Sequence, residues 1–276
     1  METVRILWSG LTGNTGKAAI GQSANVPGVE IAAGLSRWPQ SSGCFKVDKE
    51  QIGKDGSKMY CGTWSEYHKW YRYSDIPSLN AARPNKGEFD IIVDFSYPDV
   101  FEEVLALAVR TNVPIIIGTS GLSDRQMAML YDATNKIPVF RSGNFRFKVK
   151  KFIDELVKLS QQHDGLILTE KFYAKKHLPS ETSKVIRRRI REATGKYVEV
   201  FSSAPYPPGS GINEWIFDAD DANNDAPLAR CRVVGYRELA EDILRIAKVM
   251  ANKPVKKGEF YDLDELWDEL VSWALS

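Results

Sequence analysis

The sequence predicts an α/β protein with two domains, a parallel sheet covered by helices and then an α+β domain with a mixed sheet. Two observations lead to this fold class. In the first half, short and nearly continuous apolar segments alternate with helical stretches, which is typical of parallel strands buried on both faces. In the second half, strand-like segments follow one another with only one substantial helix among them.

The first half opens with the strand-like VRILWSG at 4–10, followed by an alanine-rich helical stretch that runs through Ala24. Apolar residues at helical spacing predict further helices, and Ser123 with Gln126 forms a capping box at the start of one of them. These helices are predicted over 98–112 and 122–136, and the other strands over 29–36, 90–96, 113–120 and 137–143.

The second half has a different character. Strands are predicted at 165–174, 196–204, 213–219 and 229–236. The last helix, over 236–253, has one apolar face and is expected to pack back on the first domain. The predicted dinucleotide-binding domain is therefore 1–145 completed by 238–276, and the predicted substrate and oligomerisation domain is 146–237.

Composition excludes several classes of protein. The chain has 276 residues, 43% of them apolar and 26% charged, which is ordinary for a soluble globular protein. Its 37 basic and 36 acidic side chains give a net charge of +1, so no charge excess favours nucleic acid or an anionic membrane. No apolar run approaches the ~20 residues of a membrane span, and the N-terminus leads directly into a strand without a signal peptide.

The three cysteines are scattered and show no metal-ligand spacing, so no metal site and no disulfide framework are expected. Neither His68 nor His163 has ligand-like neighbours. We therefore expect a reduced, cytoplasmic protein without a bound metal.

A phosphate-binding turn is predicted immediately after the first strand. In SGLTGNTGK (9–17), Gly10, Gly13 and Gly16 permit a tight turn and let a phosphate approach backbone N–H groups at a helix N-terminus. Glycines of this kind also serve plain strand-to-helix turns. The context of a strand before, a helix after and a second strand ending about 20 residues on favours a dinucleotide-binding, Rossmann-like domain.

The second strand ends in GLSR, which bears on the choice of cofactor. A carboxylate at this point would bind the ribose hydroxyls of NAD. Ser36 and Arg37 stand there instead, so a 2′-phosphate meets no negative charge and a guanidinium can bind it. The alternative is that Arg37 is a surface charge. NADPH is favoured as the cofactor, with NADH possible.

An ordered set of motifs resembles the dihydrodipicolinate reductase (4-hydroxy-tetrahydrodipicolinate reductase) family. These motifs are GLTGNTG, VDFSYPD, IGTSGLS, GNFRFKV and EKFYAKKHLPSETS, and the resemblance covers the whole chain except 40–89. It implies an N-terminal dinucleotide-binding domain, a mixed α/β substrate domain and a homo-oligomer, a tetramer or a dimer. It also implies reduction of a small anionic cyclic carboxylate, as in lysine biosynthesis, with a nicotinamide cofactor.

The same resemblance assigns roles to individual residues. Lys176 matches the catalytic lysine, and Ser180 and Thr182 match a loop that holds a substrate carboxylate. A loop at a helix N-terminus beside a lysine is also a sound carboxylate site on physical grounds. The cofactor residues implied are Gly10, Gly13, Asn14, Thr15 and Gly16 at the pyrophosphate, and Phe95, Gly118, Ser120, Gly143 and Phe145 at the nicotinamide.

The departures from the family pattern fall in the substrate half. Phe172 and Tyr173 replace two adjacent histidines, and Glu181 replaces a glycine beside the expected anion site. A family GEHE element is GINE at 211–214, and His177 lies near the position of a family aspartate. The pattern indicates a relative with altered chemistry, in which Tyr173 is the candidate proton donor.

Three functions remain open from the sequence. The first is an NADPH-dependent reductase of a C=N or conjugated C=C bond. The second is a catalytically impaired relative that binds NADP(H) and acts as a sensor or subunit. The third is a nucleic-acid or partner-binding module that uses IRRRIRE (186–192) and the aromatic residues of 40–89, which could stack on bases. The near-zero net charge argues against the third, and an insertion hairpin packed on the domain edge is the simpler interpretation of 40–89.

Overall fold

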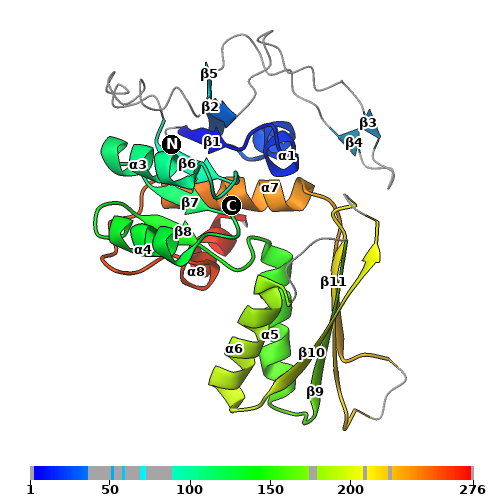
Figure 1. The fold of residues 1–276 in the computed structure, drawn as a ribbon. Helices are drawn as coiled ribbons and strands as arrows, with labels where there is room; N and C mark the ends of the chain where they lie inside the picture. The colour runs from blue at the N-terminus through cyan, green and yellow to red at the C-terminus, as the bar shows by residue number, and fades with distance from the viewer. Residues whose placement is uncertain are drawn as a thin grey trace. The chain divides into compact units, whose positions relative to one another are not determined.

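The computed structural model describes residues 3–36, 51–52, 58–59, 69–72, 89–173, 179–207, 210–222 and 226–274 (Figure 1). The chain divides into two compact units. Unit 1 consists of Met1–Ser142 and Leu239–Ser276, and unit 2 consists of Gly143–Glu238.

Unit 1 contains a parallel sheet of six strands in the order β5-β2-β1-β6-β7-β8. Numbered along the chain, these strands run 3-2-1-4-5-6, the order of the doubly wound dinucleotide-binding fold. The order reverses between β1 and β6, so a crevice is expected where these two strands end. The strands are β1 Val4–Ser9, β2 Val29–Ser36, β5 Lys69–Arg72, β6 Ile91–Asp94, β7 Ile115–Ile117 and β8 Val139–Arg141.

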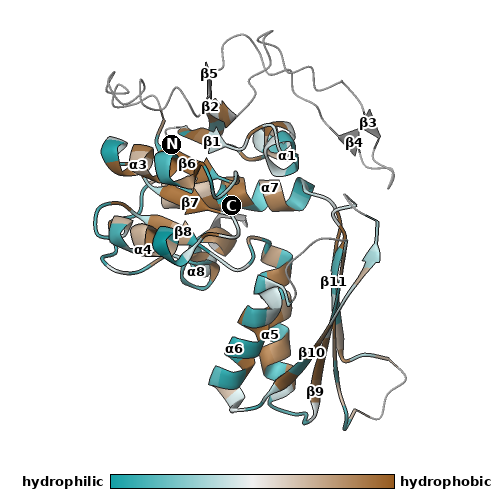
Figure 2. Cartoon of the chain, in the orientation of Figure 1, coloured by the Kyte–Doolittle hydropathy of each residue, from teal (hydrophilic) through white to brown (hydrophobic). Residues whose placement is uncertain are grey.

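The strands of this sheet are apolar because helices pack on them (Figure 2). All four residues of β6 and all three of β7 are buried, and Ile92, Ile115 and Ile117 join side chains of α3 in one core cluster. The predicted capping box is confirmed, since the Ser123 side chain and Gln126 bond reciprocally at the start of α4. The helices of unit 1 are α1 Asn14–Gln22, the 3-10 turn η1 Ser23–Asn25, α3 Phe101–Thr111, α4 Asp124–Ala133, α7 Arg237–Met250 and α8 Leu263–Ala274.

The C-terminal segment Leu239–Ser276 completes unit 1. The first two residues of α7, Arg237 and Glu238, belong to unit 2. The apolar side of α7 is buried, with Ile243, Ile246 and Met250 fully enclosed. Beyond α7, Tyr261 pairs with Phe140 and its carbonyl accepts the N–H of Arg141 at 2.9 Å, so this segment lies along β8. Helix α8 follows and was not predicted from the sequence.

Unit 2 contains a mixed four-stranded sheet in the order β10-β9-β11-β12. Strands β9 and β10 pair in parallel, whereas β11 pairs antiparallel with both β9 and β12, so the predicted mixed sheet is confirmed. Helices α5 and α6 lie together on one face of this sheet (Figure 1). The elements are α5 Phe147–Ser160, β9 Leu166–Tyr173, α6 Glu181–Thr194, β10 Val198–Tyr206, β11 Asn213–Ala219 and β12 Ala229–Val233.

Strand β9 alternates strictly between buried and half-buried residues, which shows which side chains face the helices. Leu166, Leu168, Glu170 and Phe172 are buried on that face. The half-buried residues that alternate with them, on the other face of the sheet, include Thr169, Lys171 and Tyr173. This alternation places Glu170 among apolar neighbours and leaves Tyr173 accessible.

The segment 40–89 contributes a short antiparallel pair, β3 Gln51–Ile52 and β4 Lys58–Met59, and the edge strand β5. Strand β5 was not predicted. Most of the aromatic residues at 64–73 lie outside the described residues. Within the described part of the chain, no helix is both long and apolar enough to cross a membrane.

Candidate functional site

The turn after β1 is built from close backbone approaches. Gly10 has φ +82°, and a Cβ there would lie 2.3 Å from the carbonyl oxygen of Phe95, at the end of β6. A Cβ at Gly16 would lie 2.4 Å from the carbonyl oxygen of Leu11. Any side chain at either position would therefore displace the backbone of the turn, so these two glycines are needed for its shape.

Gly13 has a different environment. It is the N-cap of α1 with extended backbone (φ −74°, ψ 171°), and a Cβ there would meet only the carbonyl oxygen of Gly10, at 3.2 Å. Without a side chain, Gly13 cannot cap the helix, and α1 has no acidic residue in its first turn. The first N–H groups of α1, which belong to Asn14 and Thr15 among others, therefore suit an anion, and the turn fits a pyrophosphate.

Phe95 and Gly118 lie together at the ends of β6 and β7. The Phe95 ring is within 2.2 Å of where a Cβ of Gly118 would be, so only glycine permits this approach. The ring also stacks on Trp8 with 5.9 Å between centroids. Ser120 is exposed two residues beyond Gly118. Phe95 and Gly118, two of the five residues expected at the nicotinamide, therefore lie near the glycine turn, within unit 1.

A buried carboxylate connects the strand ends at this edge. Asp94 accepts hydrogen bonds from the hydroxyls of Ser96 at 2.5 Å and Thr119 at 2.8 Å, and the Thr119 hydroxyl accepts the N–H of Ser96 at 3.1 Å. Burial raises the pKa of Asp94, and the hydrogen bonds from Ser96, Ser9 and Thr119 oppose that rise. Because Ser9 ends β1 while Ser96 and Thr119 follow β6 and β7, Asp94 fixes the ends of the three strands relative to one another.

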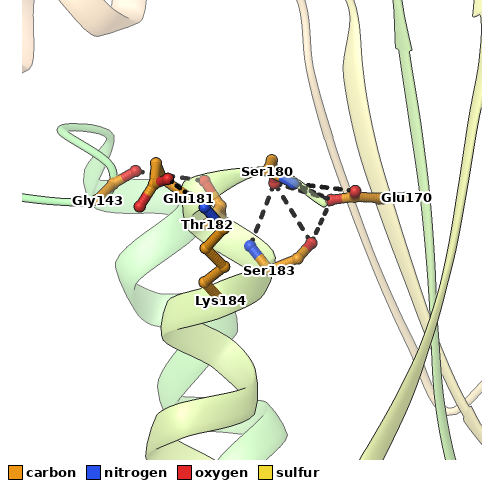
Figure 3. A network of polar contacts seen from close by, with 7 residues as sticks. All are labelled: Gly143, Glu170, Ser180, Glu181, Thr182, Ser183 and Lys184. Carbon is orange, nitrogen blue, oxygen red and sulfur yellow. Dashed lines mark hydrogen bonds and ion pairs between the residues drawn. The ribbon is translucent and has the colours of Figure 1, made fainter. Parts of the chain in front are cut away.

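The N-terminus of α6 in unit 2 holds a second buried carboxylate, that of Glu170 (Figure 3). The side chain is completely buried and accepts from the N–H of Ser180 at 3.0 Å and from its hydroxyl at 2.8 Å. The hydroxyls of Ser183 and Ser202 also donate to it, the latter at 2.6 Å. Ser180 in turn caps α6 by accepting the N–H of Ser183 at 3.2 Å. Glu170 thus attaches the first turn of α6 to β9 and β10.

Thr182, the other expected substrate residue, contacts the segment before α5. The Nδ2 of Asn144 donates to its hydroxyl at 2.9 Å, and that hydroxyl lies 3.5 Å from the carbonyl oxygen of Gly143. A Cβ at Gly143 would lie 2.7 Å from a methyl of Val185. Gly143 and the buried Phe145 were expected at the nicotinamide, and in the structure their segment is joined to the first turn of α6.

Glu181 points away from this network. Its side chain is 66% exposed and forms an ion pair of 2.7 Å with Lys184, one turn along the helix. Exposed pairs of this kind contribute little to stability. The positive charge of Lys184 nevertheless partly neutralises the negative charge of Glu181.

The two residues that replace the family's histidines have opposite environments. Phe172 is fully buried and meets Trp215 edge-on, with 5.7 Å between ring centroids. Tyr173 is half-buried, and its hydroxyl lies 3.4 Å from that of Tyr236. Burial first, and then the Tyr236 hydroxyl, raise the pKa of Tyr173 to about 12. Phe172 is therefore a core residue, whereas Tyr173 can reach a ligand as a protonated phenol.

Two predicted residues, Arg37 and Lys176, lie outside the described residues. Conversely, the sequence analysis missed Asp94, Glu170, Asn144 and Tyr236. The sequence does carry a signal for Asp94 and Glu170, because each is an acidic residue within a predicted strand, at a position that faces the core. Within the described residues, no three His, Cys, Asp or Glu side chains are grouped so as to hold a metal.

A model of the family described as dihydrodipicolinate reductase, N-terminus, matches residues 4–145, slightly more than half of the chain. The chain belongs to the dihydrodipicolinate reductase family. The match includes the glycine turn, Asp94, Phe95 and Gly118. The candidate site of unit 1 therefore lies within the part of the chain that the family model covers.

Curated members of the family are similar to parts of the chain. The 4-hydroxy-tetrahydrodipicolinate reductase of Exiguobacterium sibiricum is 29% identical over 42% of this chain and 48% of that enzyme. The enzyme of the same name from Thermomicrobium roseum is 23% identical over 69% of this chain and 66% of that enzyme. The first of these matches thus spans about half the length of the relative.

Solved structures extend the likeness of fold to both units. Dipicolinate-bound dihydrodipicolinate reductase from Paenisporosarcina sp. TG-14 matches with a TM-score of 0.61 and 17% identity, over 96% of this chain and 99% of that one. A myo-inositol dehydrogenase from Corynebacterium glutamicum matches with a TM-score of 0.58 and 9% identity, over 99% and 94%. These solved structures, each under 25% identical to the chain, show a likeness of fold alone.

Proposed function

We propose that the chain is an NADPH-dependent reductase that transfers hydride to a C=N or conjugated C=C bond of a small cyclic carboxylate. The observation that carries this proposal is the glycine turn at the point where the strand order of unit 1 reverses, between β1 and β6. Oxidation of NADPH in the presence of cyclic imines, followed by its absorbance, tests the proposal.

Each unit has a part in this proposal. In unit 1, the turn at Gly10–Gly16 would hold the pyrophosphate, and Phe95 with Gly118 would hold the nicotinamide ring. The bound cofactor supplies the hydride, while the protein orients both reactants and supplies a proton. We propose unit 1 as the dinucleotide-binding domain and unit 2 as the substrate and oligomerisation domain.

For the substrate, we propose that the first turn of α6 binds a carboxylate. Ser180 directs its N–H and hydroxyl to Glu170, so its part is to shape the turn. The next N–H groups, those of Glu181 and Thr182, are left for a substrate anion. Lys176 would stabilise negative charge or donate a proton, and Tyr173 is the second candidate donor.

Cofactor preference gives the first test. We expect NADPH to bind more tightly than NADH, because Arg37 would pair with the 2′-phosphate. A hydrogen bond to a charged group is worth about 1.5–3 kcal/mol, so Arg37→Ala should remove about ten- to a hundredfold of the preference. Titration calorimetry with both cofactors measures it, and NADH affinity is the internal control. Equal affinities in the unmodified protein would contradict the assignment.

Gly13→Val gives the second test. A Cβ at Gly13 makes one tight contact, 3.2 Å from the carbonyl oxygen of Gly10, which a small shift relieves, and the side chain occupies the approach to the first N–H groups of α1. We expect NADPH binding to be lost at a stability cost of about 1 kcal/mol, the usual scale for a changed N-cap. Gly13→Ala should show a smaller loss of affinity. Undiminished NADPH binding by the valine variant would place the pyrophosphate elsewhere. Gly16 is unsuitable, because its Cβ would displace the turn itself.

A second candidate function is a catalytically impaired relative that binds NADP(H) as a sensor or subunit. The burial of Phe172 favours it, because the position of one family histidine has become core. The two functions differ in a single measurement. A reductase oxidises NADPH when given a suitable imine, whereas a sensor binds NADPH without consuming it.

We further propose a soluble, cytoplasmic homo-oligomer that binds neither nucleic acid nor membrane. The face of the unit 2 sheet opposite α5 and α6 includes Phe201, whose side chain is 51% exposed, and it is the surface on which a second copy could pack. Light scattering of the full chain in solution tests for the dimer or tetramer.

A further inference from the structure

Two tyrosine hydroxyls meet at one end of the unit 2 sheet. Tyr173 is the last residue of β9, and Tyr236 follows β12 by three residues, yet their hydroxyl oxygens are 3.4 Å apart. Both side chains are half-buried. Two phenols at this distance share one hydrogen bond but have two hydroxyl protons, so the pair can donate to a third oxygen.

Tyr236 is held in place by its neighbours. Arg146, the residue before α5, is 5% exposed, and its Nη2 donates to the carbonyl of Gly235 at 2.6 Å. Gly235 has φ +67°, a conformation that favours glycine. On the other side, a Cβ at Gly211 would lie 3.0 Å from the Cα of Gly235 and 3.3 Å from Cε2 of Tyr236. The turn that presents the second phenol is therefore fixed from two directions.

The charges around the pair favour an anion. Arg146 is a permanent cation, and its charge acts to lower the pKa of Tyr173 against the larger effects of burial and of Tyr236. Nearby, burial raises the pKa of Cys231, and the positive charges of Lys148 and Arg146 oppose that rise. Neutral phenol donors beside a buried guanidinium form a setting in which an oxygen anion gains charge-assisted hydrogen bonds.

We propose that Tyr173 and Tyr236 form an oxyanion-binding subsite that takes one carboxylate of the substrate, with Arg146 as its positioning residue. This inference rests on the proposed reductase function and deepens it. Tyr173 stands where the family has a histidine, whereas neither Tyr236 nor Arg146 was predicted from the sequence.

Binding of aromatic carboxylates to the full chain saturated with NADPH tests the subsite. The probes are dipicolinate, picolinate and pyridine, which differ in having two, one and no carboxylates. We expect Tyr236→Phe to weaken picolinate binding by about ten- to a hundredfold, the value of a hydrogen bond to a charged group. Pyridine binding should not change. Tyr197→Phe, at a tyrosine of unit 2 that is 67% exposed, is the matched control and should behave as the unmodified protein.

A spectroscopic titration separates this role from a merely structural one. The hydrogen bond between Tyr173 and Tyr236 helps to raise the pKa of Tyr173 to about 12, so Tyr236→Phe should let Tyr173 ionise at a lower pH. The ultraviolet absorbance of tyrosinate reports this, with Tyr173→Phe identifying the signal. Arg146→Lys keeps the charge but loses the planar fork, and it should weaken picolinate binding while NADPH binding is kept.

The outcomes distinguish this inference from the proposed function. If NADPH binds and imines are reduced but Tyr236→Phe leaves picolinate affinity unchanged, the subsite is refuted and the reductase stands. If picolinate binding depends on Tyr236 while no imine is reduced, the subsite stands and the reductase is refuted. Failure of the unmodified protein to bind picolinate at all would also overturn the subsite.

Discussion

Replacing Glu170 by alanine is expected to destabilise the protein by about 3–5 kcal/mol, because four buried donors lose their acceptor at once. The carboxylate accepts from one N–H and three hydroxyls and is completely buried. Alanine would leave those donors without an acceptor, each at a cost of about 1–3 kcal/mol. Water that enters the cavity and accepts from them reduces this cost. Urea unfolding of the full chain followed by circular dichroism measures the loss.

Two further variants make this prediction specific. Glu170→Gln keeps the shape and one acceptor oxygen, and the serine hydroxyls can rotate to meet its amide, so it should lose about 1–3 kcal/mol. Glu181→Ala removes a glutamate from the same turn that is 66% exposed, and it should change stability by at most about 0.5 kcal/mol. Equal losses for Glu170→Ala and Glu181→Ala would show that the network does not hold the turn.

The fold was largely predictable because burial on both faces leaves a clear sequence signal. The five strands of unit 1 other than β5 are short apolar runs, and the capping box of α4 and the apolar face of α7 are local patterns. Helix α5 was missed, since its segment FKVKKFIDELVKLS mixes lysines with apolar residues and follows a motif assigned to the cofactor. Helix α8 was missed after the long polar stretch 251–262. Strand β5 follows a segment without periodicity.

The site was predictable only where backbone geometry restricts residue type. Gly10 and Gly16 were identified because no other residue fits their turn. By contrast, the role of Ser180 depends on a carboxylate ten residues earlier, and nothing in the local sequence says that Glu170 faces it. Likewise, the contact between Tyr173 and Tyr236 joins residues 63 positions apart. Such pairs follow from strand order and register, which the sequence pattern did not specify.

The structure also changes what the two missing histidines mean. Because β9 alternates, positions 172 and 173 face opposite sides of the sheet. Phe172 packs on Trp215 in the core, so a histidine there would bury a polar ring among apolar side chains. Of the two residues, only Tyr173 is partly exposed. In the proposed reaction, Tyr173 is therefore the one of the two that could take over a role of the histidine pair.

Reduction of tetrahydrodipicolinate by the unmodified protein should be about 10²–10⁴ slower than by a family member with both histidines, the usual contribution of a general acid. The pH dependence should differ as well. A histidine donor with an ordinary pKa of about 6.5 is lost as pH rises through neutrality. Tyr173, whose pKa is raised to about 12 by burial and by Tyr236, stays protonated throughout that range. Steady-state rates between about pH 6 and 10 should therefore show no decline attributable to the donor.

Four variants complete this test. Tyr173→His should introduce a decline above about pH 6.5, and Tyr173→Phe should lower the rate at every pH, while Tyr197→Phe should change neither. Lys176→Ala should abolish turnover if that lysine stabilises charge on the substrate. Efficient reduction of tetrahydrodipicolinate by the unmodified protein would show instead that Lys176 and the α6 turn suffice without either histidine.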